Sequence, residues 1–377
     1  MESPKKSVNK FFRSGFLPTK LYRILSIFLI REKTFLLIIL IAFILSAFFY
    51  PYPKIAMWLG FLFAAYSATA NDSIQTIGTF LVSNYHRKWY ILWGFISAIF
   101  VVTAWYSWYH FSGDVSYQRL STDGLEKTPE SYQFLQVAAP IFLMILTRMR
   151  MPVSTTFLLL SIFSTKSSGI ISMLEKSLWG YIIAFTVAII VWTILNKLIR
   201  KLLQGEAHPG WTVAQWVSSG ALWAVWIMQD AANVAVYLPR SLNGWQFALF
   251  VLIFVIGLGI LFFMKGDKIQ KIVNEKTAVT DVRAATIIDF IYAIILFFFK
   301  TISHVPMSTT WVFIGLLGGR EVAMNILTNA VDRKNRVIVL KMIGKDIFLA
   351  FLGLVVSIIL AISINPNLRE ELFSIFK

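Results

Sequence analysis

The chain has 377 residues, of which 57% are hydrophobic, 16% aromatic and only 14% charged. Soluble domains carry about a quarter charged residues, so this composition excludes a soluble globular protein and predicts an all-α polytopic membrane protein. The absence of cysteine excludes disulfides and thiolate metal sites, whereas the net charge of +16 could indicate either nucleic-acid binding or membrane topology.

The apolar windows predict seven membrane spans and two shorter helical hairpins. A helix needs about 20 apolar residues to cross a hydrocarbon core of roughly 30 Å. Before the first span, residues 1–33 place apolar side chains at helical spacing among Lys and Arg, which predicts a basic helix lying on the inner leaflet. The spans are expected at 34–50, 57–83, 89–110, 178–196, 214–238, 245–264 and 346–364, and the hairpins at about 132–165 and 286–318.

The basic residues follow the membrane topology. With the N-terminus inside, 24 of the 35 Lys and Arg fall in the inside segments, whereas the outside loop 111–131 is acidic. This is the positive-inside pattern, so we expect a multi-pass protein of the plasma (inner) membrane with a cytoplasmic N-terminus and no nucleic-acid partner. The inside segments are 1–33, 84–88, 197–213, 265–285 and 319–345.

Two of the expected spans contain an aspartate flanked by amides. An aspartate near the middle of a membrane helix costs roughly 2.5–3.5 kcal/mol on the insertion scale, so it indicates a function by default. The second stretch follows the first after 158 residues and keeps both the acid and the amides, which indicates an internal repeat. Asp72 aligns with Asp230, Asn71 with Gln229, and Gln75 with Asn233.

A second motif is also duplicated: Met151-Pro-Val-Ser-Thr-Thr156 recurs as Val305-Pro-Met-Ser-Thr-Thr310. Only about 11 apolar residues follow each proline, and as a helix they rise about 16 Å, half a bilayer. Each limb is therefore expected to turn back as a re-entrant hairpin, buried in protein or lining a watery cavity. The hydroxyls would lie at a helix start beside free backbone N–H groups, which is a site for an oxyanion.

The two halves are expected to be inverted. Three complete crossings separate the two aspartate spans, so these spans run in opposite directions, and the hairpins enter from opposite sides. Inverted-topology repeats with broken helices near the midplane are typical of secondary transporters. Repeat 1 is expected over 57–200 and repeat 2 over 214–364, with an extra helix and loop at 34–56 and a tail at 365–377.

These motifs, in this order and duplicated, resemble the inorganic phosphate transporter (PiT) family. Its signatures are a paired Gly-Ala-Asn-Asp-x-Ala-Asn and a paired Pro-Val-Ser-Thr-Thr-His, and the resemblance covers roughly 57–320. The chain departs from the second signature, because Phe157 and Trp311 replace the histidines. The resemblance implies a homodimeric, inverted-repeat symporter that moves phosphate with Na⁺ or H⁺, and some relatives carry sulfate.

The resemblance also implies roles for matching residues. Asp72 and Asp230 would ligate Na⁺, with the four flanking amides as partners. The hydroxyl triplets would hold phosphate, and Arg148, just before the first triplet, could draw the anion, snorkel or pair with a carboxylate. The implied cation set is Asp72, Asp230, Asn71, Gln75, Gln229 and Asn233, and the implied phosphate set is Ser154, Thr155, Thr156, Ser308, Thr309 and Thr310. Arg148 is added to the phosphate set from its position before the hairpin bend, not from the resemblance.

Electrostatics favours the same function. Moving phosphate inward against an inside-negative potential costs about 2.3 kcal/mol per charge per 100 mV, and coupling to two or more cations reverses the sign. We therefore expect a symporter that imports phosphate with Na⁺, or H⁺, by alternating access in the lipid bilayer, without an organic cofactor.

Several alternatives remain open at this stage. The aspartates could be structural, the triplets could be helix N-caps, and the protein could be a sulfate permease or a passive anion channel. Enzyme motifs and a phosphate-binding loop for ATP are absent, so we expect no enzyme. An intramembrane aspartyl protease would explain neither the amides nor the triplets. The roles of Arg150, Asp289, Lys300 and His304 are left undecided.

Overall fold

The computed structural model is helical, and the residues it describes contain no strand. Within that part of the chain, six helices are long and apolar enough to cross a membrane, as expected for an integral membrane protein. Residues 1–18, at the start of the predicted interfacial segment, lie outside the described residues. The structure describes 19–122, 124–149, 151, 153–195, 201, 204–263, 281–327, 333–365 and 368–370.

The chain divides into two compact units, 1–48 and 49–377. The first unit is described from Thr19 onwards as part of one continuous helix, α2, which begins before the predicted span. The helices in chain order are α2 (Thr19–Phe49), α3 (Pro53–Thr76), α4 (Gly78–Ser83), α5 (Trp89–His110), η1 (Arg119–Ser121), α6 (Phe134–Arg148), η2 (Thr156–Leu160), α7 (Ser167–Ile194), α9 (Gly210–Ala235), α10 (Gly244–Phe263), α12 (Val282–Ile302), α13 (Thr309–Leu327) and α14 (Arg333–Ile364).

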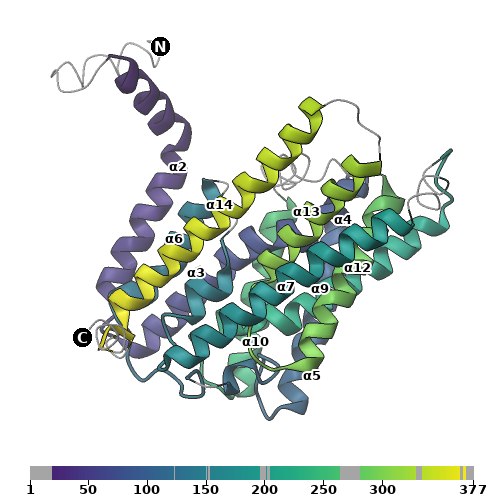
Figure 1. Ribbon diagram of the computed structural model, residues 1–377. Coiled ribbons are helices and arrows are strands. Elements are labelled where there is room, and N and C mark those ends of the chain that lie inside the picture. Colours follow the sequence, from purple (N-terminus) through teal and green to yellow (C-terminus); the bar gives the residue numbers. More distant parts are fainter. Residues whose placement is uncertain are drawn as a thin grey trace, which may run out of the picture. The chain divides into compact units, whose positions relative to one another are not determined.

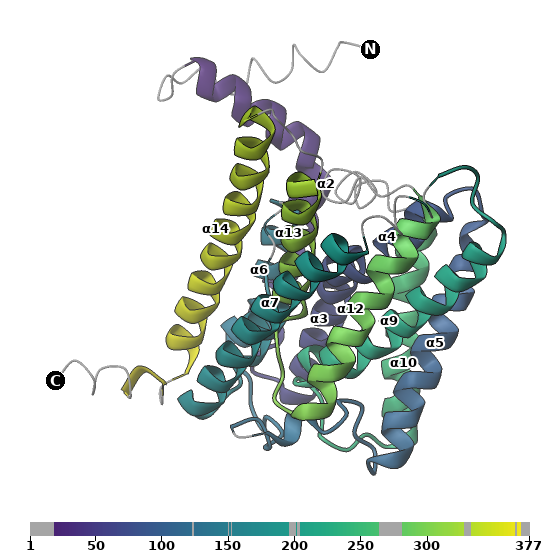
Figure 2. The same ribbon diagram turned by 45° about the vertical axis from the view of Figure 1, so that its right-hand side comes forward.

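The second unit is organised around two closely packed helix pairs. Figures 1 and 2 show α13 lying beside α7, and α12 beside α9. Helix α3, which carries Asp72, packs against α6, α9 and α10. Both duplicated motifs are therefore held among helices from both halves of the sequence.

Several predicted spans differ from the observed helices; α14, for example, begins at Arg333 and not at 346, and two other differences bear on the site. The span 57–83 is broken at Ile77, between α3 and α4, just after the Asp72 motif. Helix α7 begins at Ser167, whereas the sequence predicted a start at 178. The charged residue Lys176 therefore lies inside the helix and does not mark its beginning. The Lys176 ammonium donates to the carbonyls of Ser303 (2.8 Å) and Val305 (2.6 Å).

The limb after the second proline motif is longer than expected. Helix α13 has 19 residues, a rise of about 28 Å, whereas the sequence predicted about 11 residues ending near Gly318. The glycines do not break the helix: a Cβ built on Gly319 would lie 2.2 Å from the carbonyl oxygen of Phe185, so glycine allows α13 to approach α7. The charges beyond pair with each other, Arg320 with Glu321 at 3.2 Å.

The limb after the first motif is short, as predicted. It is a single π-helical turn, η2, and the chain then turns until the Thr165 amide donates to the carbonyl of Gly124 at 2.9 Å. Gly124 lies in the loop that precedes α6, so this limb returns to the end from which the hairpin started. The inversion of the two halves and the re-entrant placement of both hairpins in a membrane stay predictions.

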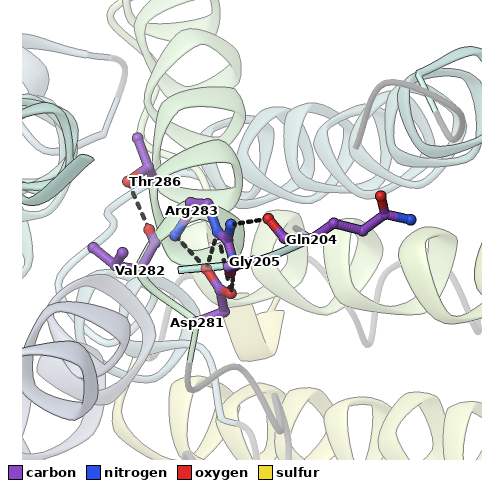
Figure 3. Close-up of polar contacts among 6 residues, drawn as sticks. All are labelled: Gln204, Gly205, Asp281, Val282, Arg283 and Thr286. Atoms are coloured by element: carbon purple, nitrogen blue, oxygen red, sulfur yellow. Dashed lines mark hydrogen bonds and ion pairs between the residues drawn. The ribbon is translucent and has the colours of Figure 1, made fainter. Parts of the chain in front are cut away.

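The start of α12 is fixed by an aspartate cap (Figure 3). Asp281 accepts from the backbone amide of Arg283 at 2.8 Å and pairs with its guanidinium at 2.6 Å. The same guanidinium donates to the carbonyls of Gln204 and Gly205, both at 3.2 Å, which ties α12 to the segment that leads into α9. The hydrogen bond from the Arg283 side chain lowers the pKa of Asp281.

The close approach of α7 and α13 gives a stability prediction. Replacing Gly319 by alanine places a methyl group against the Phe185 carbonyl, so we expect about 1–3 kcal/mol of destabilisation, measured as a lower melting temperature of the detergent-solubilised protein. The matched control is Gly257→Ala on α10, where a Cβ meets nothing within 4 Å and better helix propensity keeps the melting temperature unchanged or raises it. Equal shifts in the two variants would contradict the packing.

Candidate functional site

The two motif aspartates are buried, and each accepts a hydrogen bond from the proline motif of its own half. Asp72 is 1% exposed and Asp230 is 3% exposed. The Thr155 hydroxyl donates to the Asp72 carboxylate at 2.8 Å, and the Thr309 hydroxyl donates to that of Asp230 at 2.5 Å. Thr155 and Thr309 are both the middle residue of a Ser-Thr-Thr triplet, so the same contact occurs in each half.

The third residue of each triplet reaches the other half. The Thr156 hydroxyl donates to the carbonyl of Met307 at 2.9 Å, and the Thr310 hydroxyl donates to that of Val153 at 3.4 Å. Val153 and Met307 precede the serines of the two triplets. We call residues 153–156 the first tip and residues 307–310 the second tip, and the two tips therefore bind each other reciprocally. Thr156 also lies 3.5 Å from a carboxylate oxygen of Asp230.

The flanking amides complete this network through their nitrogen atoms. Gln75 donates to Thr310 and Asn233 donates to Thr156, both at 3.2 Å. These two amides are aligned in the repeat, and each contacts the triplet of the opposite half. The other aligned pair differs: Asn71 donates to the Asp72 carboxylate at 2.9 Å, whereas Gln229 donates to the carbonyl of Leu296 on α12 at 2.8 Å.

The amide oxygens are largely left without donors. The side-chain oxygens of Gln75, Gln229 and Asn233 are buried and find no hydrogen-bond donor in the described part of the chain. The fourth, that of Asn71, accepts from Thr147 at 3.1 Å. Because buried polar atoms are normally paired, three orphan acceptors on residues that flank the two aspartates in the sequence fit a hard cation that binds oxygen.

The serines of the triplets act as helix caps. The Ser154 hydroxyl accepts from the backbone amide of Phe157 at 3.2 Å, and that of Ser308 accepts from the amide of Trp311 at 3.3 Å. This is the N-cap contact that the sequence offered as an alternative, and it leaves the threonine hydroxyls to face the aspartates. The aromatic residues that replace the motif histidines contact each other, with the ring centroids of Phe157 and Trp311 5.5 Å apart.

Asp289 lies apart from this cluster. Its buried carboxylate accepts from the hydroxyls of Thr79 at 2.7 Å and Ser219 at 2.5 Å. One helical turn further along α12, Tyr292 donates to the carbonyl of Thr309 at 2.9 Å, which connects this face of α12 to the second tip. Asp289 is therefore held outside the cluster by hydroxyls of α4 and α9, and its helix contacts the second motif through Tyr292.

The other basic side chains singled out in the sequence lie in different places. Arg148 is the last residue of α6 and half-buried, on the segment that leads into the first tip. Lys300 lies over the ring of Tyr117 with its ammonium 5.8 Å from the centroid. The His304 side chain is exposed, and Arg150 lies outside the described residues.

Sequence reasoning missed Arg119, which is 1% exposed. Its guanidinium donates to the carbonyl of Met228 at 2.7 Å, two residues before Asp230, and to those of His304 at 3.3 Å and Val305 at 3.1 Å. Burial lowers the pKa of Arg119 to about 10, so it stays protonated at neutral pH. The available signal was an arginine in a loop whose other charges are mostly acidic.

A solved structure described as "The sodium-dependent phosphate transporter" is similar to this chain, with a TM-score of 0.53 at 17% sequence identity. The similarity covers 85% of this chain and 99% of that chain. The two proteins share a fold. The expected all-helical membrane architecture is thereby confirmed, whereas this identity carries no substrate from one protein to the other. No protein-family model and no curated protein sequence matches the chain.

The threonine–aspartate contacts can be tested through stability. Thr155→Val and Thr309→Val each leave a buried carboxylate without one hydroxyl donor, and a hydrogen bond to a charged group contributes about 1.5–3 kcal/mol. We expect each variant to lower the melting temperature in detergent clearly. Thr301→Val is the control, because Thr301 is exposed on α12 and its hydroxyl donates to the Phe298 carbonyl of the same helix. Melting temperatures like that of the control would contradict the site geometry.

Proposed function

We propose that the protein is a secondary active symporter that imports inorganic phosphate with Na⁺ through the site where the two tips meet. The observation that carries this proposal is the single buried network that joins both aspartates to both hydroxyl triplets. A shared fold with a sodium-dependent phosphate transporter supports it. As further parts of the proposal, the protein works by alternating access as a homodimer in the plasma (inner) membrane, with its N-terminus in the cytoplasm.

The cation would be held by carboxylate and amide oxygens. Asp72 and Asp230 supply the charge, and the unpaired oxygens of Gln75, Gln229 and Asn233 supply neutral ligands in the same buried region. This donor set favours Na⁺ over H⁺, because a proton needs only the carboxylate, whereas a metal ion uses several oxygens at once. Asn71 would position the Asp72 carboxylate through its 2.9 Å hydrogen bond.

The anion would lie between the tips. Both triplets stand where a helix begins, so backbone N–H groups and threonine hydroxyls from the two halves face one region. A phosphate placed there would replace the reciprocal hydrogen bonds from Thr156 to Met307 and from Thr310 to Val153. Arg148 would add positive charge on the approach to the first tip.

Coupling follows from charge. Without cations, the carboxylates of Asp72 and Asp230 repel an anion at the adjacent hydroxyls. Bound Na⁺ neutralises them, so cation binding is the condition for phosphate to enter. Two or more Na⁺ per phosphate also offset the cost of moving negative charge inward, about 2.3 kcal/mol per charge per 100 mV.

Sulfate is the second candidate substrate, because it is also tetrahedral and doubly charged and would use the same hydroxyls.

A passive anion channel fits less well as an alternative to coupled transport. The tips hydrogen-bond each other directly, from Thr156 to Met307 and from Thr310 to Val153, and a channel has no use for cation ligands.

Transport in proteoliposomes tests the coupling. An inward Na⁺ gradient is expected to drive uptake of labelled phosphate, and Asp72→Asn and Asp230→Asn are expected to reduce its initial rate about a hundredfold or more, since a buried charged ligand is lost. Glu175→Gln, an exposed carboxylate on α7, is the control and should transport normally. Parallel arms with labelled sulfate and with an H⁺ gradient identify the substrate and the ion. Uptake that persists in both aspartate variants would refute the mechanism.

The amide oxygens give a separate prediction about the ion. Asn233→Leu removes one proposed ligand, so the Na⁺ concentration for half-maximal uptake is expected to rise about tenfold, the usual effect of losing one good polar contact. The maximal rate at saturating Na⁺ should change less. If uptake in Asn233→Leu shows the same Na⁺ dependence as in the unmodified protein, this oxygen is not a ligand.

A further inference from the structure

Two cationic side chains converge on one backbone carbonyl next to the second tip. The Val305 carbonyl accepts from the Arg119 guanidinium at 3.1 Å and from the Lys176 ammonium at 2.6 Å. The two charged groups are therefore no farther apart than the sum of these distances. They come from different elements, Arg119 from the loop after α5 and Lys176 from α7, so the fold brings them together.

Neither cation is matched by a nearby carboxylate. Within the described residues, no acidic oxygen lies within 4 Å of Arg119 or Lys176, and all of their hydrogen bonds go to backbone carbonyls. The carboxylate that acts on Arg119 over a longer distance is Asp230, in the proposed cation site. The protonated guanidinium of Arg119 and the amine of Lys176 share neutral acceptors, so positive charge and N–H donors lie in a largely buried place without a close carboxylate.

Donors also remain available there. The outer Nη2 group of Arg119 has no hydrogen-bond partner in the described part of the chain, and Lys176 uses two acceptors for its three N–H groups. Arg119 is 1% exposed, whereas Lys176 is partly exposed, so the pair extends from the surface towards the tip. A planar guanidinium fork beside an ammonium suits a phosphate or sulfate oxygen.

The loop that carries Arg119 is built to hold it in place. The Asp114 carboxylate accepts from the backbone amides of Ser116 at 2.8 Å and Gln118 at 2.6 Å. Tyr117 and Gln118 have positive φ values, 55° and 61°, a conformation that side chains rarely adopt and that clusters at functional sites. The Tyr117 hydroxyl anchors the loop to the Thr103 carbonyl of α5 at 2.7 Å.

We propose that Arg119 and Lys176 form a separate oxyanion subsite, which takes phosphate or sulfate before the anion reaches the threonine triplets. The carbonyls that hold the two side chains include those of Val305, three residues before Ser308, and of Met228, two residues before Asp230. The subsite is therefore adjacent to the site of the threonine triplets. Only the onward passage of the anion rests on the proposed transport function. The subsite itself requires the two cations alone.

A purely structural role makes a different prediction. Cations near the carbonyls that follow α12 would stabilise its C-terminal end by themselves. One cation suffices for that role, and anions would then have no effect on either residue. Na⁺-free binding that is weakened in the Arg119 and Lys176 variants separates the two explanations, and under the proposed coupling the aspartates keep an anion out of the central site when no cation is present.

The experiment is equilibrium binding of labelled phosphate and sulfate to the purified full chain in Na⁺-free choline buffer. We expect the unmodified protein to bind, and Arg119→Gln and Lys176→Gln each to weaken binding about tenfold or more. Arg119→Lys should restore part of the affinity because the charge is kept. Lys176→Gln, at a partly exposed position, keeps the test valid if Arg119→Gln does not fold.

The matched control is Arg240→Gln. Arg240 is another arginine bound to carbonyls, those of Leu125, Lys127, Val236 and Leu238, but within the described residues no second cationic side chain shares them. Its loss should leave Na⁺-free binding unchanged. Absent binding in the unmodified protein, or equal binding in all variants, overturns the subsite. Binding that depends on Arg119 in a protein without Na⁺-driven uptake would uphold the subsite and reject the transport function.

Discussion

The contact on which the site depends is the hydrogen bond from a threonine hydroxyl to a buried carboxylate, made once in each half. Asp72 and Asp230 are almost fully buried, and such a carboxylate is costly unless donors surround it. The middle threonine of each triplet supplies one donor, Thr155 to Asp72 and Thr309 to Asp230. This requirement places each hairpin tip against the helix that carries the aspartate, and the third threonines then bind the opposite tip.

The same network has the chemistry that the proposed site requires, in which a cation and an anion would share one region. Hydroxyls can donate to a carboxylate or to an oxyanion, whereas amides can donate through nitrogen and ligate a metal through oxygen. Gln75 and Asn233 already use their nitrogen atoms on Thr310 and Thr156, which points their oxygens elsewhere and leaves them unpaired. One set of side chains therefore presents ligands for positive charge and donors for negative charge.

The sequence predicted those parts that depend on local chemistry. Helix α5 runs over 89–110 as predicted, because its apolar run is continuous and ends at polar turns. The aspartates and triplets were found because they are duplicated. Contacts between distant segments could not be read in this way: the limb after the second proline motif was expected to end at the polar break near 318, yet Gly319 allows the helix to continue packed against Phe185. Lys176 looked like a loop residue, because its carbonyl partners lie more than a hundred residues away.

The two ends of the site differ in charge, although the motifs within it are duplicated. Along α12, Asp289 lies in the first half of the helix, whereas Arg119 and Lys176 meet the carbonyls that follow its last residue, a separation of about 20 Å along the helix axis. The aligned position of Thr79, which binds Asp289, is Tyr237, whose hydroxyl donates to the Gln136 carbonyl instead. A perfect repeat would place the same charges at both ends and would give no preference for direction. A positive group at one end and an acidic group at the other make the two ends electrostatically different, so the differences between the halves, more than their likeness, would give the proposed transport its direction.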